Sequence, residues 1–128
     1  MTYRLDPAEF FVVLADPLRR RILLLLLAQG SLCVCELFHA LDVVQPKVSR
    51  HLALMRAAGV LSQRKCGKWV IYQMHRQMPL WAVRIVQEMA EGMGADALCA
   101  NDRARLTSMP NRPDRTALLG KTAAQAAA

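Results

Sequence analysis

The chain has 128 residues, 54% of them hydrophobic, and a formal net charge of +7. This length suits one domain with its own hydrophobic core and is short for two. The longest apolar run, ILLLLLA at 22–28, is far below the ~20 residues that span a bilayer, so no transmembrane segment is expected. No secretory signal pattern fits the start of the chain. We therefore expect a cytoplasmic protein whose four cysteines are reduced thiols rather than disulfides.

Aspartate and proline mark the starts of the first two predicted helices. Asp6-Pro7 and Asp16-Pro17 each combine a favourable N-cap with a proline in the first turn. The first helix is apolar almost all round, and the second is predicted to end at Gly30. A short third helix is predicted from about Cys33 to Leu41.

A fourth helix and a hairpin follow. Gln45-Pro46 opens the helix, which is predicted to reach Gly59 and to bury Val48, Leu52 and Met55 at helical spacing. Residues 60–75 then contain two runs of β-forming residues around a central glycine, which predicts a two-stranded hairpin.

The last predicted helix runs from Pro79 to about Met93, and its polar residues form only a narrow stripe. A terminal helix with so much apolar surface cannot bury it within one small domain. Together with the apolar first helix, this pattern predicts a homodimer built on the first and last helices. We expect residues 1–95 to form a DNA-binding and dimerisation domain and residues 96–128 to be a flexible tail.

Positive charge is concentrated in one window of the chain. Residues 45–76 contain seven lysines and arginines and no acidic residue. Such a region is typical of a protein that binds a polyanion, most often nucleic acid. Two short helices joined by a tight turn and followed by a basic hairpin predict a winged helix-turn-helix: a mainly α fold with a β-hairpin that binds double-stranded DNA.

Candidate DNA contacts follow from this fold. Gln45 and Arg50 are the candidates for base contact, because Gln can read adenine and Arg can read guanine in the major groove. The other candidates are expected to contact phosphates or to support those contacts: Lys47, Ser49, His51, Arg56, Lys65 and Lys68. For His51, a packing role is the main expectation.

The segment LCVCELFHALDVVQPKVSRHLALMRAAGVLSQRKCGKWVIYQMH, residues 32–75, resembles the centre of the arsenical-resistance repressors of the ArsR/SmtB family. The resemblance covers about residues 5–95. It implies a homodimeric winged-helix repressor that binds operator DNA ahead of resistance genes and requires no cofactor. It further implies release by a trivalent metalloid, arsenite or antimonite.

Cys33 and Cys35 are the candidate metalloid ligands. Cys33 stands at a predicted N-cap, with Glu36 three residues later as half of a capping box. Cysteine is not a favoured cap, which suggests another role, and an N-cap is not helical, so the two thiols need not diverge. A helix start is also expected to favour the thiolate. The alternative is two small apolar side chains packed at a helix start.

The third ligand is open. In the resembling repressors with LCVCxLC, a third cysteine occupies the position that is Phe38 here. An exogenous thiol could complete the site, or the ligand could be a methylated trivalent arsenical that needs only two sulfurs. Cys99 or Cys66 could also contribute, although neither is expected within easy reach.

Other functional classes remain as alternatives. The chain could be a winged-helix DNA-binding protein without a metalloid inducer, a thiol redox-sensing repressor or a metalloid carrier. An enzyme is not expected, because the sequence has no CxxC motif, no recognisable nucleophile–base spacing and no glycine-rich phosphate loop.

Overall fold

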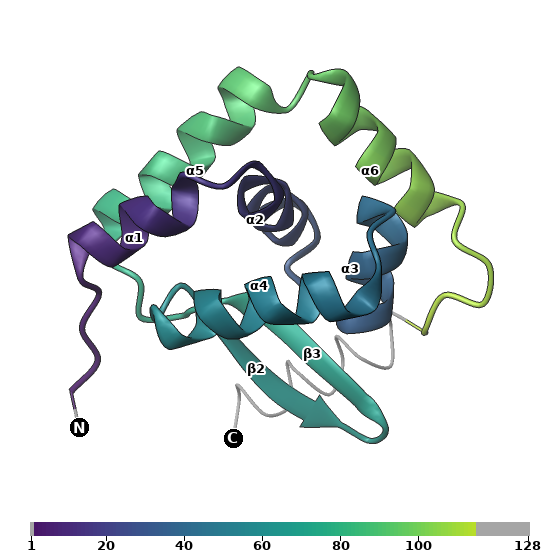
Figure 1. Cartoon of the computed structure of the whole chain (residues 1–128), viewed down its shortest axis with the longest axis horizontal. Coiled ribbons are helices and arrows are strands. Elements are labelled where there is room, and N and C mark those ends of the chain that lie inside the picture. The colour runs from purple at the N-terminus through teal and green to yellow at the C-terminus, as the bar shows by residue number, and fades with distance from the viewer. Residues whose placement is uncertain (1, 115–128) are drawn as a thin grey trace.

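Two aspartates start the first two helices of the computed structural model, which describes residues 2–114 (Figure 1). Asp6 caps α1 (Pro7–Leu14) and Asp16 caps α2 (Pro17–Gln29), and each carboxylate accepts a hydrogen bond of 3.1 Å from a first-turn N–H. α2 ends at Gly30, whose φ of +86° is a conformation that side chains with a Cβ rarely adopt. Both helix starts lie where the sequence predicts them.

The next two helices, α3 (Val34–Leu41) and α4 (Gln45–Ala57), form the predicted helix-turn-helix pair. The tight turn between them is made by Asp42, which adopts the left-handed conformation with φ +56°. The predicted inward face of α4 is fully buried, and it consists of Val48, Leu52 and Met55.

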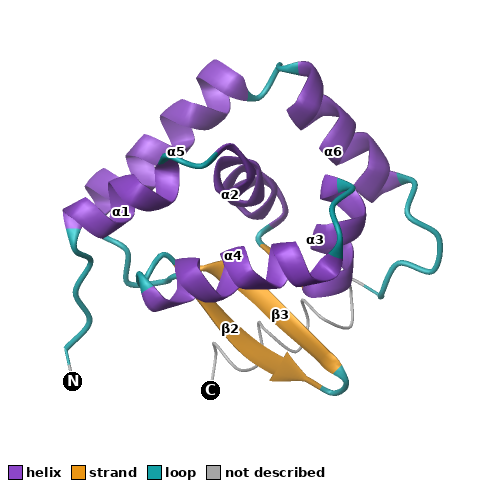
Figure 2. Cartoon of the chain, viewed as in Figure 1, coloured by secondary structure: helices purple, strands orange, loops and turns teal. Residues whose placement is uncertain are grey.

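The hairpin also forms as predicted (Figure 2), but it belongs to a three-stranded antiparallel sheet. β2 (Leu61–Cys66) and β3 (Trp69–Met74) turn at Gly67. β1 (Ser31–Cys33) adds to the other side of β3, which places β3 at the centre of the sheet. A strand of three residues leaves no recognisable periodicity, so the sequence did not reveal β1.

The C-terminal prediction is wrong in part. α5 (Leu80–Met93) lies where it was expected, but α6 (Ala97–Thr107) forms inside the segment expected to be a flexible tail. α6 packs against α3 and α2 and buries Leu106. Residues 115–128 of the predicted tail lie outside the described residues. The ordered domain therefore extends past residue 95.

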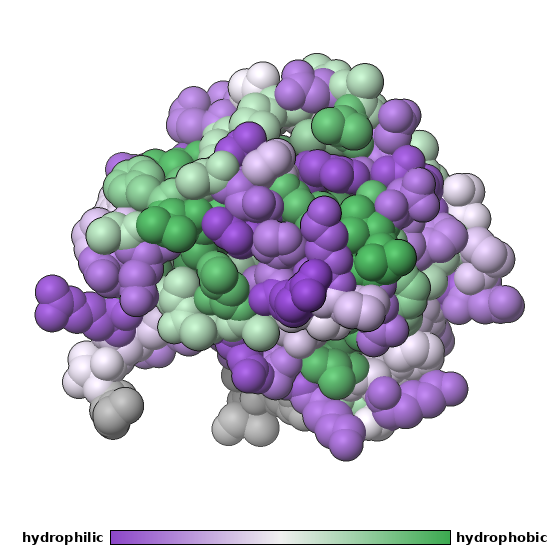
Figure 3. All heavy atoms as spheres, viewed as in Figure 1, coloured by the Kyte–Doolittle hydropathy of each residue, from purple (hydrophilic) through white to green (hydrophobic). Residues whose placement is uncertain are grey.

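Large apolar side chains stay exposed on α1 and α5. The exposed fraction is 52% for Phe11, 58% for Val12, 60% for Leu80 and 41% for Trp81. Phe10 meets Trp81 edge-on with 5.5 Å between ring centroids, so the two helices share one apolar surface. Figure 3 shows apolar side chains on the α1 side of the molecule. No helix within residues 2–114 is long and apolar enough to cross a membrane.

A buried carboxylate attaches α6 to the rest of the fold. The side chain of Asp102 is 2% exposed, and its oxygens accept hydrogen bonds from Arg21 of α2 at 2.7 and 2.9 Å. Arg105, one turn along α6, donates to the same carboxylate at 2.9 Å. Burying a charge without partners is costly, so this three-residue network ties α6 to α2.

We predict that Asp102→Ala lowers the free energy of unfolding by about 3 kcal/mol, because it leaves the largely buried Arg21 guanidinium without its carboxylate. Urea unfolding monitored by circular dichroism measures this change. Glu91→Ala, which removes an exposed carboxylate from α5, should change the same quantity by less than about 0.5 kcal/mol. Equal unfolding midpoints for the two variants would contradict a docked α6.

Candidate nucleic-acid interface and thiol pair

The outer face of α4 carries the polar side chains expected to meet DNA. Gln45, Lys47, Arg50 and Arg56 are exposed, and Ser49 is half-buried. The N-cap of α4 is a valine, which has no side-chain oxygen for the first-turn N–H groups. A helix start with open N–H groups and nearby cations attracts phosphate oxygens.

His51 lies between α4 and the rest of the helical layer. Its Nδ1 is 3.3 Å from Nη1 of Arg19, and the other guanidinium nitrogens of Arg19 donate to the carbonyl oxygens of Val12 and Val13. Burial lowers the pKa of His51, the Asp16 carboxylate acts in the opposite direction, and the Arg19 cation adds a smaller lowering effect. The neutral ring therefore accepts a hydrogen bond from Arg19. This is a packing contact of the kind expected for His51, but its partner was not visible in the sequence.

The hairpin lies beside α4 and presents two further cations. Lys65 and Lys68 are exposed on either side of the Gly67 turn, and α4 packs against β2 (Figure 2). The ammonium of Lys68 lies 5.0 Å from the centroid of the Trp69 ring, which is half-buried. The fold thus brings the basic residues of α4 and of the hairpin to neighbouring elements.

The two candidate thiols lie side by side at the start of α3. Cys33 is fully buried, Cys35 is half-buried, and their Sγ atoms are 2.6 Å apart. The backbone of Cys33 is extended (φ −81°, ψ 163°), because it is both the last residue of β1 and the N-cap of α3. Two thiols separated by one residue inside a regular helix would point about 200° apart. The extended cap removes that divergence.

A capping box surrounds Cys33. Its backbone N–H donates to Oε1 of Glu36 at 3.0 Å, and the backbone N–H of Glu36 faces the Cys33 sulfur. The Glu36 side chain is fully buried, and its second oxygen accepts a hydrogen bond of 2.6 Å from Nε of Arg112. The spacing of Cys33 and Glu36 predicted half of this box. No local pattern could reveal Arg112, which is 76 residues away from Glu36.

The protonation state of Cys33 differs from the expectation. Burial raises the pKa of this thiol, and the hydrogen bond with Cys35 and the charge of Glu36 act in the same direction. The Glu36 backbone N–H acts in the opposite direction and does not offset burial. The prediction that the helix start favours a thiolate at this position is therefore wrong, because desolvation outweighs the helix terminus.

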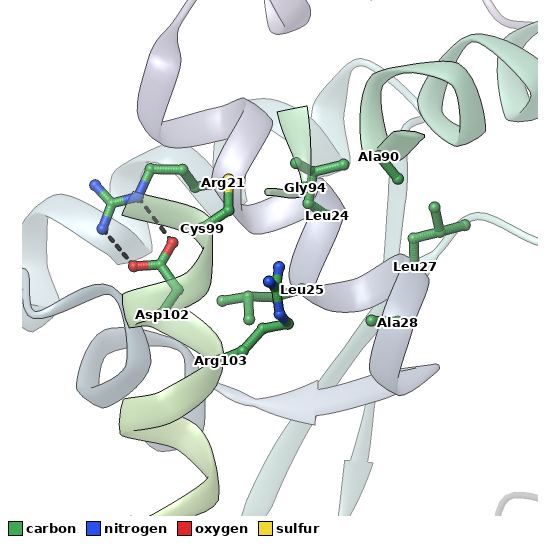
Figure 4. A pocket seen from close by; sticks show the side chains of 10 residues that line it. All are labelled: Arg21, Leu24, Leu25, Leu27, Ala28, Ala90, Gly94, Cys99, Asp102 and Arg103. Carbon is green, nitrogen blue, oxygen red and sulfur yellow. Dashed lines mark hydrogen bonds and ion pairs between the residues drawn. The ribbon is translucent and has the colours of Figure 1, made fainter. Parts of the chain in front are cut away.

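Neither of the other two cysteines lies on β1 or α3, the elements that carry the pair. Cys66 belongs to the same apolar cluster as Cys33 and Ile71, but it lies on β2, on the other side of β3 from β1, and it pairs with Trp69, whereas Cys33 pairs with Ile71. Cys99 lines a cavity of about 280 Å³ with Arg21 and Asp102 (Figure 4). Within residues 2–114, no three Cys, His, Asp or Glu side chains are grouped to hold a metal ion.

Phe38 occupies the position at which the resembling repressors have a third cysteine. Its ring is half-buried and packs against the main hydrophobic core. The described chain therefore offers two adjacent sulfurs at this site, and the pair matches soft, thiophilic ligands.

Comparison with known proteins identifies the family. Residues 16–63 match the family model described as bacterial regulatory protein, arsR family. Over 113 residues, 85% of this chain and 84% of the relative, the sequence is 44% identical to the arsenic resistance transcriptional regulator ArsR1 of Pseudomonas putida KT2440. It is 52% identical over 82 residues to the arsenical resistance operon repressor of Escherichia coli K12, covering 64% of this chain and 70% of that protein.

A solved structure supports the same assignment. The reduced form of HlyU from Vibrio cholerae N16961 superposes with a TM-score of 0.61 at 26% sequence identity, covering 67% of this chain and 86% of that one. The relatives are regulators of transcription, and the fold is the winged helix-turn-helix expected of them. The chain belongs to the ArsR family of bacterial transcriptional regulators and is not an enzyme.

Proposed function

We propose that this protein is a homodimeric repressor that binds operator DNA and is released when a trivalent arsenic or antimony species binds Cys33 and Cys35. The observation that carries the proposal is the contact between the two Sγ atoms at the first turn of α3, the helix that packs against α4. The relatives are named as arsenic-resistance regulators, and this supports an arsenical as the inducer.

Operator binding is assigned to the exposed face of α4 and to the hairpin. Gln45 and Arg50 reach base edges in the major groove, and Lys47, Ser49 and Arg56 hold phosphates. Two further residues contact the backbone beside the helix or the minor groove, and these are the exposed Lys65 and Lys68. His51 positions α4 through Arg19 instead of contacting DNA.

Dimerisation is assigned to α1 and α5. The exposed rings of Phe11 and Trp81, with Val12 and Leu80, form an apolar surface that a second copy of the chain would cover. A two-fold dimer places two recognition helices on successive turns of the duplex, as symmetric operators require.

The protonated Cys33 thiol suits a hydroxylated metalloid. At neutral pH arsenite is the uncharged acid As(OH)₃, and each thiol that bonds to arsenic releases one water formed from the thiol proton and an arsenic hydroxyl. Two As–S bonds form, two As–O bonds break, and no oxidant or reductant is needed. The remaining valence keeps its hydroxyl, takes an exogenous thiol, or is already occupied by the carbon of a methylated arsenical.

Ligation alters α3 because Cys33 is its N-cap. A sulfur bonded to arsenic must leave its place in the capping box, so the first turn of α3 shifts and α4 shifts with it. An allosteric coupling of about 1–3 kcal/mol is typical and corresponds to about 5–150-fold in operator affinity.

We predict that Cys35→Ser abolishes release, because one thiol cannot chelate the metalloid. Fluorescence anisotropy of a labelled duplex, selected for binding by the wild type, measures release as arsenite, antimonite or methylarsenite is added. Cys99→Ser, which leaves the thiol pair intact, should behave as the wild type does. If arsenite releases both Cys33→Ser and Cys35→Ser from DNA at the concentrations that release the wild type, the metalloid site lies elsewhere.

For the DNA contacts, we predict that Arg50→Ala weakens operator binding by about 5–150-fold and relaxes its sequence preference. Lys47→Ala should weaken binding to any duplex and reduce the slope of log affinity against log salt by about one. Arg103→Ala removes an exposed charge from α6, away from the surface assigned to dimerisation, and serves as the control. Equal losses on operator and random DNA for Arg50→Ala would rule out base contact.

We predict that the affinity of the thiol pair for a divalent cation depends on pH, whereas its affinity for arsenite does not. Because burial raises the pKa of Cys33, a soft cation such as Cd²⁺ must displace a proton that is still bound at neutral pH. Its apparent affinity should therefore rise with pH, about tenfold per unit for each proton displaced. Arsenite condensation carries the proton away as water and should change little between pH 6 and 8. Titrations of both ligands at several pH values measure the difference, and parallel pH profiles would contradict it.

A further inference from the structure

The C-terminal part of the chain holds the cysteine-bearing helix α3 at both ends. At its C-terminus, Arg105 of α6 donates to the carbonyl oxygen of Ala40 at 2.7 Å, and Arg21 donates to that of Leu41 at 2.9 Å. Both guanidinium groups also bind the buried carboxylate of Asp102. These cations satisfy carbonyl groups that the end of a helix leaves without intrahelical partners.

The chain that follows α6 turns back toward α3 (Figure 1), and its Arg112 contacts the first turn of that helix. Nε of Arg112 donates to Oε2 of Glu36 at 2.6 Å, and Nη2 donates to the side-chain oxygen of Gln29 at 3.2 Å. Arg112 therefore connects the end of α2 to the first turn of α3. We call Asp102, Arg105 and Arg112 the C-terminal clamp.

Arg112 of the clamp is connected to the thiol pair through the carboxylate of Glu36. Oε1 of Glu36 accepts the N–H of Cys33, while Oε2 accepts from Arg112. With both oxygens engaged, Glu36 is fixed in the orientation that the capping box requires. Ligation takes the Cys33 sulfur out of that box, so whatever stabilises the box opposes ligation.

We propose that Arg112 is a positioning residue that sets the metalloid concentration at which the repressor leaves DNA, by fixing Glu36 in the capping box of Cys33. This inference rests on the proposed function. Weakening the clamp lowers the free-energy cost of moving the Cys33 sulfur, so release then occurs at a lower metalloid concentration.

The test titrates arsenite into full-length protein bound to the labelled duplex and compares the wild type with Arg112→Gln, Arg112→Lys and Arg103→Gln. Arg103 is an exposed arginine of α6, so its replacement changes net charge equally and controls for long-range attraction to DNA. Arg112→Gln should lower the half-release concentration about fivefold or more, the lower end of typical coupling. Arg112→Lys, which keeps the charge but cannot bridge Glu36 and Gln29 as a planar fork does, should shift it less and in the same direction.

Each other outcome overturns a specific statement. If both Arg112 variants are released at the same arsenite concentration as Arg103→Gln, Arg112 is a structural contact only, even if the melting temperature falls. If Arg112→Gln does not fold by circular dichroism, an unshifted Arg112→Lys overturns the inference. If arsenite does not release the wild type, the proposed function fails and the regulatory role of the clamp fails with it.

Discussion

Cys33 belongs to two secondary structures at once, and the arrangement of β1, α3 and the thiol pair depends on this double role. It ends β1, where it pairs with Ile71 of β3, and it is also the N-cap of α3. Burial excludes water from its sulfur and its backbone, so neighbouring polar groups must come from the protein. Glu36 supplies them through its side chain, Arg112 donates to the second oxygen of Glu36, and Gln29 at the end of α2 accepts a hydrogen bond from Arg112.

Because Cys33 belongs to both β1 and α3, the thiol pair is connected to both elements to which DNA binding is assigned, α4 and the hairpin. α3 packs against α4, and β1 is paired with β3, the central strand from which the hairpin turn extends. A displacement at Cys33 therefore acts on α4 through the helix and on the hairpin through the strand. Contiguous packing of this kind can carry coupling when the connecting element has two discrete arrangements, and a capped or uncapped first turn of α3 would provide them.

Burial also determines which ligand chemistry is favoured. A solvent-exposed thiol at a helix start would lose its proton readily and would accept divalent cations. Burial raises the pKa of the Cys33 thiol, and in the proposed complex its proton leaves as water with an arsenic hydroxyl. Phe38 is packed against the core and Cys66 lies on β2, so in the proposed complex the pair offers two sulfurs and the remaining arsenic valence is left for another group.

The sequence by itself determined the parts that depend on short-range physics. Aspartate caps and proline placed the helix starts, periodicity identified the buried face of α4, and the Cys33–Glu36 spacing predicted half of the capping box. The tertiary structure alone decided the rest. β1 is too short to carry a pattern, α6 is stabilised by Asp102 pairing with a residue of α2, and Arg112 meets Glu36 across 76 residues. The pKa of Cys33 likewise depends on how completely the fold removes water, which no local pattern records.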